Sequence, residues 1–250
     1  MKKYLFILAA TASSVSSQIL AGTMGPTVLP AKTWSWVSSI SGGPIWTDSK
    51  ESRTLFLTPE IVKTYSAKKV SDVLASGEFF LGLQRNFSSD WQAQLGLAIA
   101  TAGSAKFHGV IWDDADPEFN NHTYRYKVRH KRVAVKGKLL KDYGYWLTPW
   151  VSGSLGIGFN RSHDFTNTPV IPEALPNSNF HNHTKNTFTY TVGAGLQKSI
   201  TDYLQAGIGY EFADWGKSEL GRAYDQTLNN RLNLNHFYTH GLMFNLSLVV

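Results

Sequence analysis

The 250-residue sequence contains no cysteine, no long apolar run beyond its first residues, and little net charge. Without cysteine, the chain has neither disulfide bonds nor thiolate metal ligands. No stretch of about eighteen apolar residues follows the N-terminal segment, which excludes a helical membrane protein, and the mean hydropathy is −0.20. The formal charge of +6 is dispersed rather than concentrated in a basic run, so nucleic-acid binding has little support.

The first residues have the composition of an export signal. Lys2 and Lys3 supply positive charge, residues 4–12 are mostly apolar, and small residues follow. Such a segment is removed during export. We therefore predict a cleavable signal peptide over residues 1–21, with cleavage after Ser17 or after Ala21. Residues 22–32 then form a short N-terminal segment, and residues 33–250 form the folded domain.

The last ten residues, 241–250, alternate between two kinds of side chain. One face carries Leu242, Phe244, Leu246, Leu248 and Val250, and the other face is small or polar. Alternation with period two predicts a strand, and about ten residues is the length of a tilted strand that crosses a bilayer core. A strand of this kind at the end of the sequence predicts the seam of a closed barrel.

A repeated hairpin sequence extends this pattern to the rest of the chain. Gly82–Gly96 reads GLQRNFSSDWQAQLG, and Gly195–Gly209 reads GLQKSITDYLQAGIG, so the two segments align without a gap. Each contains a strand end, a tight turn and a Gln-Ala pair that opens the next strand. A third short turn falls at 142–145. Longer polar connections alternate with these turns at 113–122, 166–185 and 214–236, an arrangement typical of outer-membrane barrels.

The pattern predicts an all-β fold, an eight-stranded antiparallel transmembrane up-and-down β-barrel with short periplasmic turns and long extracellular loops. If both ends of the barrel domain lie in the periplasm, the number of strands is even, and residues 22–32 are periplasmic. Pro59 cannot donate to a strand ladder, so Thr54–Tyr65 is predicted to be a hairpin arm within the first long loop. A ten-stranded barrel is the alternative.

The predicted strands are 33–46, 75–87, 91–112, 123–141, 146–165, 186–200, 204–215 and 236–250.

Aromatic residues concentrate near both predicted ends of the barrel. Two aromatic girdles are expected where a barrel meets the two membrane interfaces. The predicted girdle residues are Trp91, Tyr143, Tyr145, Trp146 and Tyr203 near the short turns, and Trp112 and Trp215 near the long loops.

The signal-like N-terminus, the GLQ hairpins and the amphipathic last strand resemble the small outer-membrane β-barrel surface proteins of the OmpA-like and opacity-like class. The resemblance implies an outer-membrane location, contact with lipid and lipopolysaccharide, insertion by the barrel insertion machinery, and no cofactor. It also implies a structural or surface-interaction role, adhesion-like or antigen-like, in which the loops meet a host or surface ligand. Such barrels commonly end in an aromatic residue, whereas this chain has Val250, with Phe244 the nearest aromatic.

Two other functions are weighed against this one. The alternative is a narrow OmpW-like channel for small solutes, but eight strands leave an interior that side chains fill, and Phe80, Trp146 and Trp150 are predicted to point inward. Least favoured is a lipid-modifying enzyme, suggested by the sequence Ser162-His163-Asp164. Adjacent residues of a strand face opposite sides, so Ser162 and His163 cannot meet, and we predict no enzymatic activity.

The histidines and acids of the predicted loops do not form a convincing metal site. His181 and His183 share a face of an extended segment, but the surrounding loop is polar and offers no evident scaffold. The acidic stretch 113–118 lacks the glycine of a calcium loop, because Phe119 occupies that position. We predict no metal site, and at most loose bridging of divalent cations to lipopolysaccharide.

Alternation also predicts a network of charges in the lumen. Glu78 and Glu211 fall on inward faces, and the inward face of 123–141 carries Arg132, Lys136 and Lys138. Counted from the short turns, Glu78, Arg132 and Glu211 lie at nearly equal heights, so these three charges should meet. Buried charges need partners, because a lone buried ion costs several kcal/mol.

The same strand contains an apparent conflict nearer the loops. Tyr124, Tyr126 and Val128 suit an outward face, although they share their parity with the inward Arg132. This conflict predicts a β-bulge around residues 130–133.

Overall fold

The computed structural model describes residues 34–47, 49–69, 71–174 and 177–250. The predicted signal peptide, residues 1–21, and the segment 22–32 lie outside the described residues. The described part of the chain consists of β-strands joined by turns and loops. None of it forms a helix that is long and apolar enough to cross a membrane.

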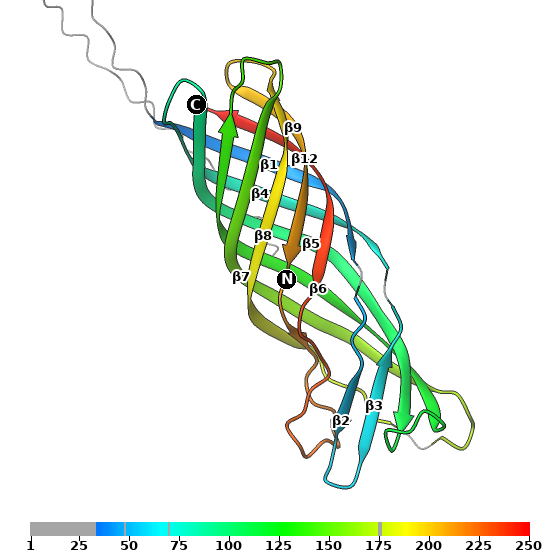
Figure 1. The fold of residues 1–250 in the computed structure, drawn as a ribbon. Helices are drawn as coiled ribbons and strands as arrows, with labels where there is room; N and C mark the ends of the chain where they lie inside the picture. The colour runs from blue at the N-terminus through cyan, green and yellow to red at the C-terminus, as the bar shows by residue number, and fades with distance from the viewer. Residues whose placement is uncertain (1–33, 48, 70, 175–176) are drawn as a thin grey trace, which may run out of the picture. The chain divides into compact units, whose positions relative to one another are not determined.

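Eight strands pair antiparallel in sequence order and close into a ring, which makes the fold an up-and-down β-barrel (Figure 1). The ring closes where the first barrel strand pairs with the last, for example Val37 with Val249. A closed ring leaves no exposed strand edge. The barrel strands are β1 (Trp34–Thr47), β4 (Val73–Asn86), β5 (Trp91–Asp113), β6 (Asn120–Lys141), β7 (Thr148–Pro169), β8 (His183–Ser199), β9 (Leu204–Asp214) and β12 (Tyr238–Val249).

The predicted eight-stranded architecture is therefore confirmed, and the predicted bounds agree with the observed ones to within a few residues. The larger differences lie away from the short turns. β6 begins at Asn120 rather than Thr123, and β7 continues to Pro169 rather than ending at Phe165. Several strands thus continue into the segments that the polar composition had marked as loops.

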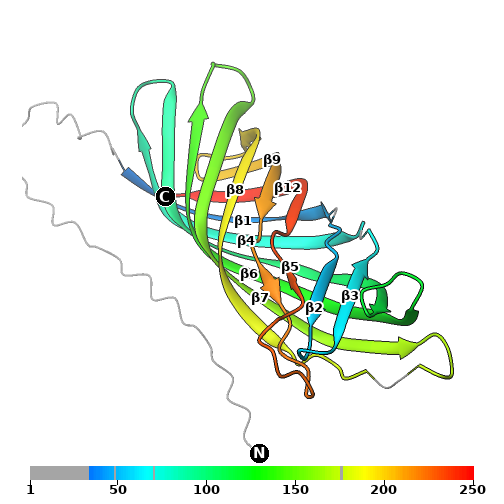
Figure 2. The ribbon, with the colours of Figure 1, turned by 60° about the horizontal axis from the view of Figure 1, so that its bottom comes forward.

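The two ends of the barrel differ in their connections (Figures 1 and 2). The short-turn end carries the turns 87–90, 142–147 and 200–203. The loop end carries the connections 170–182 and 215–237 and the segment between β1 and β4.

Two small ladders stand at the loop end. β2 (Arg53–Phe56) and β3 (Val62–Ala67) form a hairpin, and β3 pairs with the end of β5 from Lys63–Asp113 to Ala67–Gly109. The hairpin arm predicted at Thr54–Tyr65 is confirmed, and the ten-stranded barrel is wrong because this hairpin does not enter the ring. β10 (Ser218–Glu219) and β11 (Asn233–Leu234) pair within the connection from β9 to β12.

The glycines that begin and end each repeated hairpin are cross-strand partners. Gly82 pairs with Gly96, and Gly195 pairs with Gly209. A Cβ atom on Gly82 would lie 2.7 Å from the Phe80 ring, and one on Gly195 would lie 2.5 Å from the Trp150 indole. The repeat therefore places inward glycines where large aromatic side chains need room inside a narrow barrel.

Burial alternates along β6 without a break, which contradicts the predicted bulge at 130–133. Tyr124, Tyr126 and Val128 face inward and are 4%, 7% and 0% exposed. Among the register shifts in the pairings of β6, the one next to His130 lies on the neighbouring β5, between Ala102 and Ala105. The inward face of β5 changes parity there, so the extra residue is taken up by β5 and not by β6.

Candidate functional site

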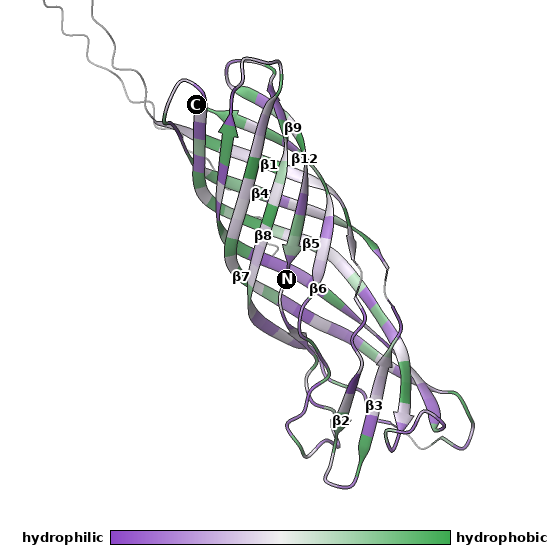
Figure 3. Cartoon of the chain, in the orientation of Figure 1, coloured by the Kyte–Doolittle hydropathy of each residue, from purple (hydrophilic) through white to green (hydrophobic). Residues whose placement is uncertain are grey.

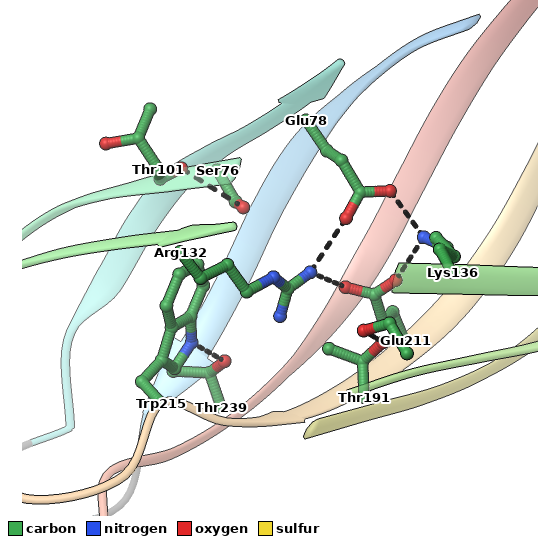
Figure 4. Close-up of polar contacts among 10 residues, drawn as sticks. Ser76, Glu78, Thr101, Arg132, Lys136, Thr191, Glu211, Trp215 and Thr239 are labelled. Carbon is green, nitrogen blue, oxygen red and sulfur yellow. Dashed lines mark hydrogen bonds and ion pairs between the residues drawn. The ribbon is translucent and has the colours of Figure 1, made fainter. Parts of the chain in front are cut away.

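Four charged side chains meet in the middle of the lumen (Figure 4). Arg132 Nη2 donates to Glu78 Oε2 at 2.8 Å and to Glu211 Oε1 at 2.9 Å. Lys136 Nζ donates to Glu211 Oε2 at 2.9 Å and also to Glu78. The four groups come from β4, β6 and β9, so the network links strands that are not neighbours in the ring.

The burial of these groups explains why they must be paired. The side chains of Arg132 and Glu78 are 2% and 3% exposed, and those of Lys136 and Glu211 are 13% and 12% exposed. Two carboxylates balance two cations, and each carboxylate contacts both cations. An unpaired charge at this depth would lose its hydration without compensation. The structure thus brings together four of the five charged residues expected in the lumen.

Lys138, the fifth, lies outside this network. Its Nζ donates to Gln197 Oε1 at 2.6 Å and stands 4.6 Å from the centre of the Trp150 ring. An amide oxygen and an aromatic face are both favourable partners for an ammonium group. The lumen therefore holds one more cation than the carboxylates of the network balance.

Trp215 covers the network on the side of the loop end. Its ring lies 4.7 Å from the Arg132 guanidinium carbon, and its Nε1 donates to Thr239 Oγ1 at 2.9 Å. Trp215 is only 1% exposed, so the prediction that it belongs to an outer aromatic girdle is wrong. Alternation along β9 offered a signal for this position, because Glu211, Ala213 and Trp215 share one parity and all point inward.

Between Trp215 and the loop end, the lumen is filled by aromatic side chains, which we call the aromatic plug. His130 stacks on Phe237 with ring centres 4.2 Å apart, and Phe107 stacks on Tyr126 at 5.1 Å. Each plug side chain is at most 7% exposed. The remaining members are Tyr65, Tyr124, Phe165 and Phe180.

The plug joins the hairpin of β2 and β3 to the barrel. Tyr65 comes from β3, and its ring lies 5.5 Å from that of Tyr124. Burial raises the pKa of Tyr65 well above its ordinary value. The first long connection is therefore packed into the mouth of the barrel rather than left as a free arm.

Toward the short-turn end, the lumen is lined by glutamines. Gln94 Nε2 donates to Gln84 Oε1 at 2.9 Å, and Gln197 Nε2 donates to Gln205 Oε1 at 2.9 Å. A cavity of about 40 Å³ separates this layer from the charge network, which is room for a water molecule or two.

The two tryptophans that were predicted to face this region differ. Trp150 is buried, whereas Trp146 is 72% exposed, so Trp146 does not belong to the lumen as predicted. It precedes β7 and lies in the turn 142–147.

The other predicted girdle residues lie on the outside of the barrel. Trp112 is partly buried on the outward face of β5 at the loop end. The exposed aromatics at the short-turn end are Trp91, Tyr143, Tyr145, Trp146 and Tyr203.

A second polar site, which we call the loop pocket, opens at the loop end with a volume of about 600 Å³. Glu219 lies at its centre and accepts from Arg231 at 3.1 Å and from Lys185 at 3.3 Å. Arg53 and Lys217 also line the pocket. The pocket lining thus carries four basic side chains and one carboxylate, and it keeps a net positive charge although Arg53 also pairs with Glu51.

The predicted acidic stretch is held by local contacts. Lys63 Nζ and Asn121 Nδ2 both lie 2.7 Å from carboxylate oxygens of Asp113. Burial opposes ionisation of Asp113, but these hydrogen bonds outweigh it and hold the pKa of Asp113 below its ordinary value. Among the described residues, no group of three or more His, Asp or Glu side chains is arranged to hold a metal ion.

Ser162 and His163 lie on opposite faces of β7. Ser162 is fully buried in the lumen, whereas His163 lies on the outer wall, where its Nδ1 is 3.1 Å from Asp164 Oδ1. The serine hydroxyl and the imidazole are therefore not arranged as a nucleophile and its base.

No protein-family model and no curated protein matches this sequence. Solved structures match over most of the chain. Neisserial surface protein A has 9% identity and a TM-score of 0.44, covering 85% of this chain and 96% of its own. The outer membrane protease OmpT from Escherichia coli has 10% identity and a TM-score of 0.47, covering 90% and 99%. The outer membrane protein OprG from Pseudomonas aeruginosa has 10% identity and a TM-score of 0.42, covering 86% and 95%.

These structures are of the class that the sequence resembles, the outer-membrane β-barrels. At these identities and at TM-scores below 0.5, the similarity carries no weight for the fold or the function. The eight-stranded ring follows from the strand pairing of this chain, and the function must be argued from its own side chains.

Proposed function

We propose that this chain is an outer-membrane barrel with a closed lumen, and that its loop end binds a ligand outside the cell. The observation that carries the proposal is the distribution of side chains in the barrel wall: the lumen is charged and polar in its middle and toward the short turns, whereas the outer wall is apolar. A soluble protein buries its large apolar side chains, and an extensive apolar surface marks contact with a membrane or a partner.

The apolar belt around the barrel wall supports the membrane location. Along the strands, hydrophobic residues alternate with hydrophilic ones (Figure 3). Ile40, Leu95 and Phe188 are 67%, 64% and 63% exposed, although they lie in regular strands. Further members of the belt are Leu81, Leu97, Ile99, Val135, Val151, Leu155, Ile157, Val192, Ile208, Phe244, Leu246 and Leu248.

The contents of the lumen favour a closed barrel over a narrow channel. The charge network spans the interior, Trp215 covers it, and the aromatic plug fills the space beyond. A solute would have to displace paired charges and tightly packed rings. We propose no catalytic role, because Ser162 and His163 face opposite sides of the wall.

A conductance measurement tests the closed lumen. Purified protein inserted into planar lipid bilayers should give no steady current above that of the bilayer alone. A stable ion conductance from the wild-type protein would favour the narrow channel instead.

The loop pocket supports the surface-interaction role and indicates the chemistry of the ligand. Lys185 and Arg231 offer charge-assisted hydrogen bonds to anionic groups. Asn229, Asn230 and Asn233 line the same pocket and suit hydroxyl groups. Cations and amides together fit an anionic saccharide better than an uncharged one.

Binding to a labelled sulfated oligosaccharide tests this assignment, with the protein in vesicles of neutral lipid. The double variant Lys185→Gln/Arg231→Gln should bind about tenfold more weakly than wild type. The control Lys50→Gln/Arg222→Gln removes one exposed lysine and one exposed arginine at the loop end that line neither the pocket nor its contacts, and it should bind like wild type. Equal losses in both variants would show charge attraction without a specific pocket.

A further inference from the structure

Strand β6 carries a row of cations on its outward face. Arg125, Lys127, Arg129 and Lys131 occupy successive outward positions, and none of them is buried. The next outward residue is Val133, where the apolar belt begins. The basic row therefore ends where the membrane-facing surface starts.

The neighbouring strands widen this row into a patch that we call the basic wall patch. Arg129 pairs directly with Arg161 on β7, and Lys127 pairs directly with Lys106 on β5. Like charges at directly opposite positions destabilise a sheet. The strand register thus concentrates positive charge instead of dispersing it.

The chain supplies little negative charge to this patch. In the part of the chain that the structure describes, the carboxylate that forms an ion pair with the patch is Asp164, 3.1 Å from Lys127 and from His163. Asp72, at the edge, accepts from the backbone amide of Lys106. The Arg129–Arg161 pair has no ion-pair partner among the described residues.

The wall is hollowed at this patch. A groove of about 430 Å³ is lined by three cationic side chains and one carboxylate, together with a histidine, a threonine and an aromatic ring: Arg129, Lys131, Arg161, Asp164, His163, Thr184 and Phe159. Phe159 is the cross-strand partner of Lys131. Two residues farther from the loop end, Ile157 pairs with Val133 in the apolar belt. One ligand could therefore place negative groups in the groove and apolar chains along the belt.

We propose that the basic wall patch binds the phosphorylated headgroup of a membrane glycolipid, with the acyl chains lying along Val133 and Ile157. The proposal rests on the proposed membrane location and adds a specific lipid site to it. A lipid is favoured over a soluble anion because the cations point sideways from the wall and adjoin the apolar belt. Paired arginines suit phosphate oxygens, since a guanidinium group donates in a fixed fork.

The experiment compares vesicles of neutral lipid that contain either bisphosphorylated lipid A or the same lipid without its phosphates. Unfolding midpoints in urea are measured for wild type and for Arg129→Gln/Arg161→Gln. The matched control is Arg85→Gln/Lys198→Gln, which removes two exposed cations at the short-turn end. A third arm adds free pyrophosphate to neutral vesicles, which separates a headgroup in the membrane from an anion in solution.

Phosphorylated lipid should raise the midpoint of wild type and of the control variant, but not that of the wall variant. In neutral vesicles the wall variant should be at least as stable as wild type, because it loses a like-charge pair. Equal shifts in all three proteins, or an equal effect of dephosphorylated lipid or of pyrophosphate, would overturn the lipid site while leaving the membrane location intact. Failure of wild type to insert into any vesicle would overturn both.

Discussion

Strand β6 presents cations on both of its faces, and the two faces differ in whether carboxylates of the chain neutralise these cations. On the inner face, Arg132 and Lys136 each contact two carboxylates at close range. On the outer face, Arg129 and Lys131 have no ion-pair partner among the described residues, and Arg129 stands opposite another arginine. The same residue types on one strand therefore meet opposite surroundings.

The difference follows from what each face can reach. Inside, the charged side chains have little access to solvent, so the counter-charges must come from the chain itself. Outside, solvent and lipid headgroups are available, so the chain leaves the charges for its surroundings to neutralise. Cations that are paired with carboxylates of the same chain stabilise the fold, whereas cations without such partners indicate a surface that binds an anion.

The largest effect is expected from breaking the inner network. Arg132→Ala leaves two carboxylates with one cation and should lower the free energy of unfolding by about 3–5 kcal/mol. Urea titration in lipid vesicles would measure this loss. Arg129→Ala on the outer face of the same strand is the control and should change the free energy by less than about 0.5 kcal/mol.

Balancing the charge should restore part of that loss. In Arg132→Ala/Glu78→Gln, Lys136 and Glu211 remain as a neutral pair, so the double variant should be more stable than Arg132→Ala alone. If the double variant is less stable than the single one, charge balance does not govern the lumen.

The next effect concerns the apolar belt below the outer cations. Leu95→Arg or Ile208→Arg should lower the free energy of unfolding by about 2–4 kcal/mol if the side chain lies near the bilayer midplane. The same vesicle titration applies. Leu95→Val serves as a control that keeps the face apolar. Negligible changes for both arginine variants would show that these faces do not meet hydrocarbon.

A smaller effect is expected where the lumen is narrow. A Cβ atom on Gly209 would lie 2.3 Å from the Trp150 indole, its nearest neighbour, so Gly209→Val should lower the stability by about 1–3 kcal/mol. Adding Trp150→Phe should recover part of the loss by making room. Gly137→Val is the comparison, because a Cβ there meets its nearest atom at 3.9 Å. Equal losses at Gly209 and Gly137 would show that the indole does not set the requirement for glycine.

The smallest effect is expected at a partly buried ion pair at the loop end, between Asp113 of β5 and Lys63 of β3. The lowered pKa of Asp113 means that its contact with Lys63 stabilises the hairpin of β2 and β3 above about pH 4 and is lost as the pH falls through the folded-state pKa. The contribution should be about 0–1 kcal/mol. Hydrogen exchange of residues 53–67 should increase from pH 7 to pH 3 more in wild type, after correction for intrinsic rates, than in Asp113→Asn.

Much of the architecture could be predicted because alternation and turn length report directly on strands. The same alternation placed Glu78, Arg132 and Glu211 on inward faces at similar heights, where the structure has them in contact. It would also have placed Trp215 and Tyr126 inward if it had been followed without exception. Their aromatic character favours the outer wall, but their parity, which points inward, agrees with their burial.

The remaining features depend on relations between strands that no single segment contains. The bulge between Ala102 and Ala105 lies on β5 and is defined only by its register against β6. The opposition of Arg129 and Arg161 appears only once the register of β6 against β7 is known. The loop pocket brings β2, β8 and the 215–237 connection together, and polar loop composition carries no such distance information.

The seam between β1 and β12 has a kinetic consequence. Every other neighbouring pair in the ring is formed by strands that follow one another among the eight, but this pair joins Val37 to Val249. Contacts between such distant residues form slowly, because most of the intervening chain must be ordered first. A chain that ends before β12 would leave β1 and β9 with open edges, which are templates for association with other chains. Folding of the barrel should therefore finish with a single late closing step, and truncated chains should aggregate rather than insert.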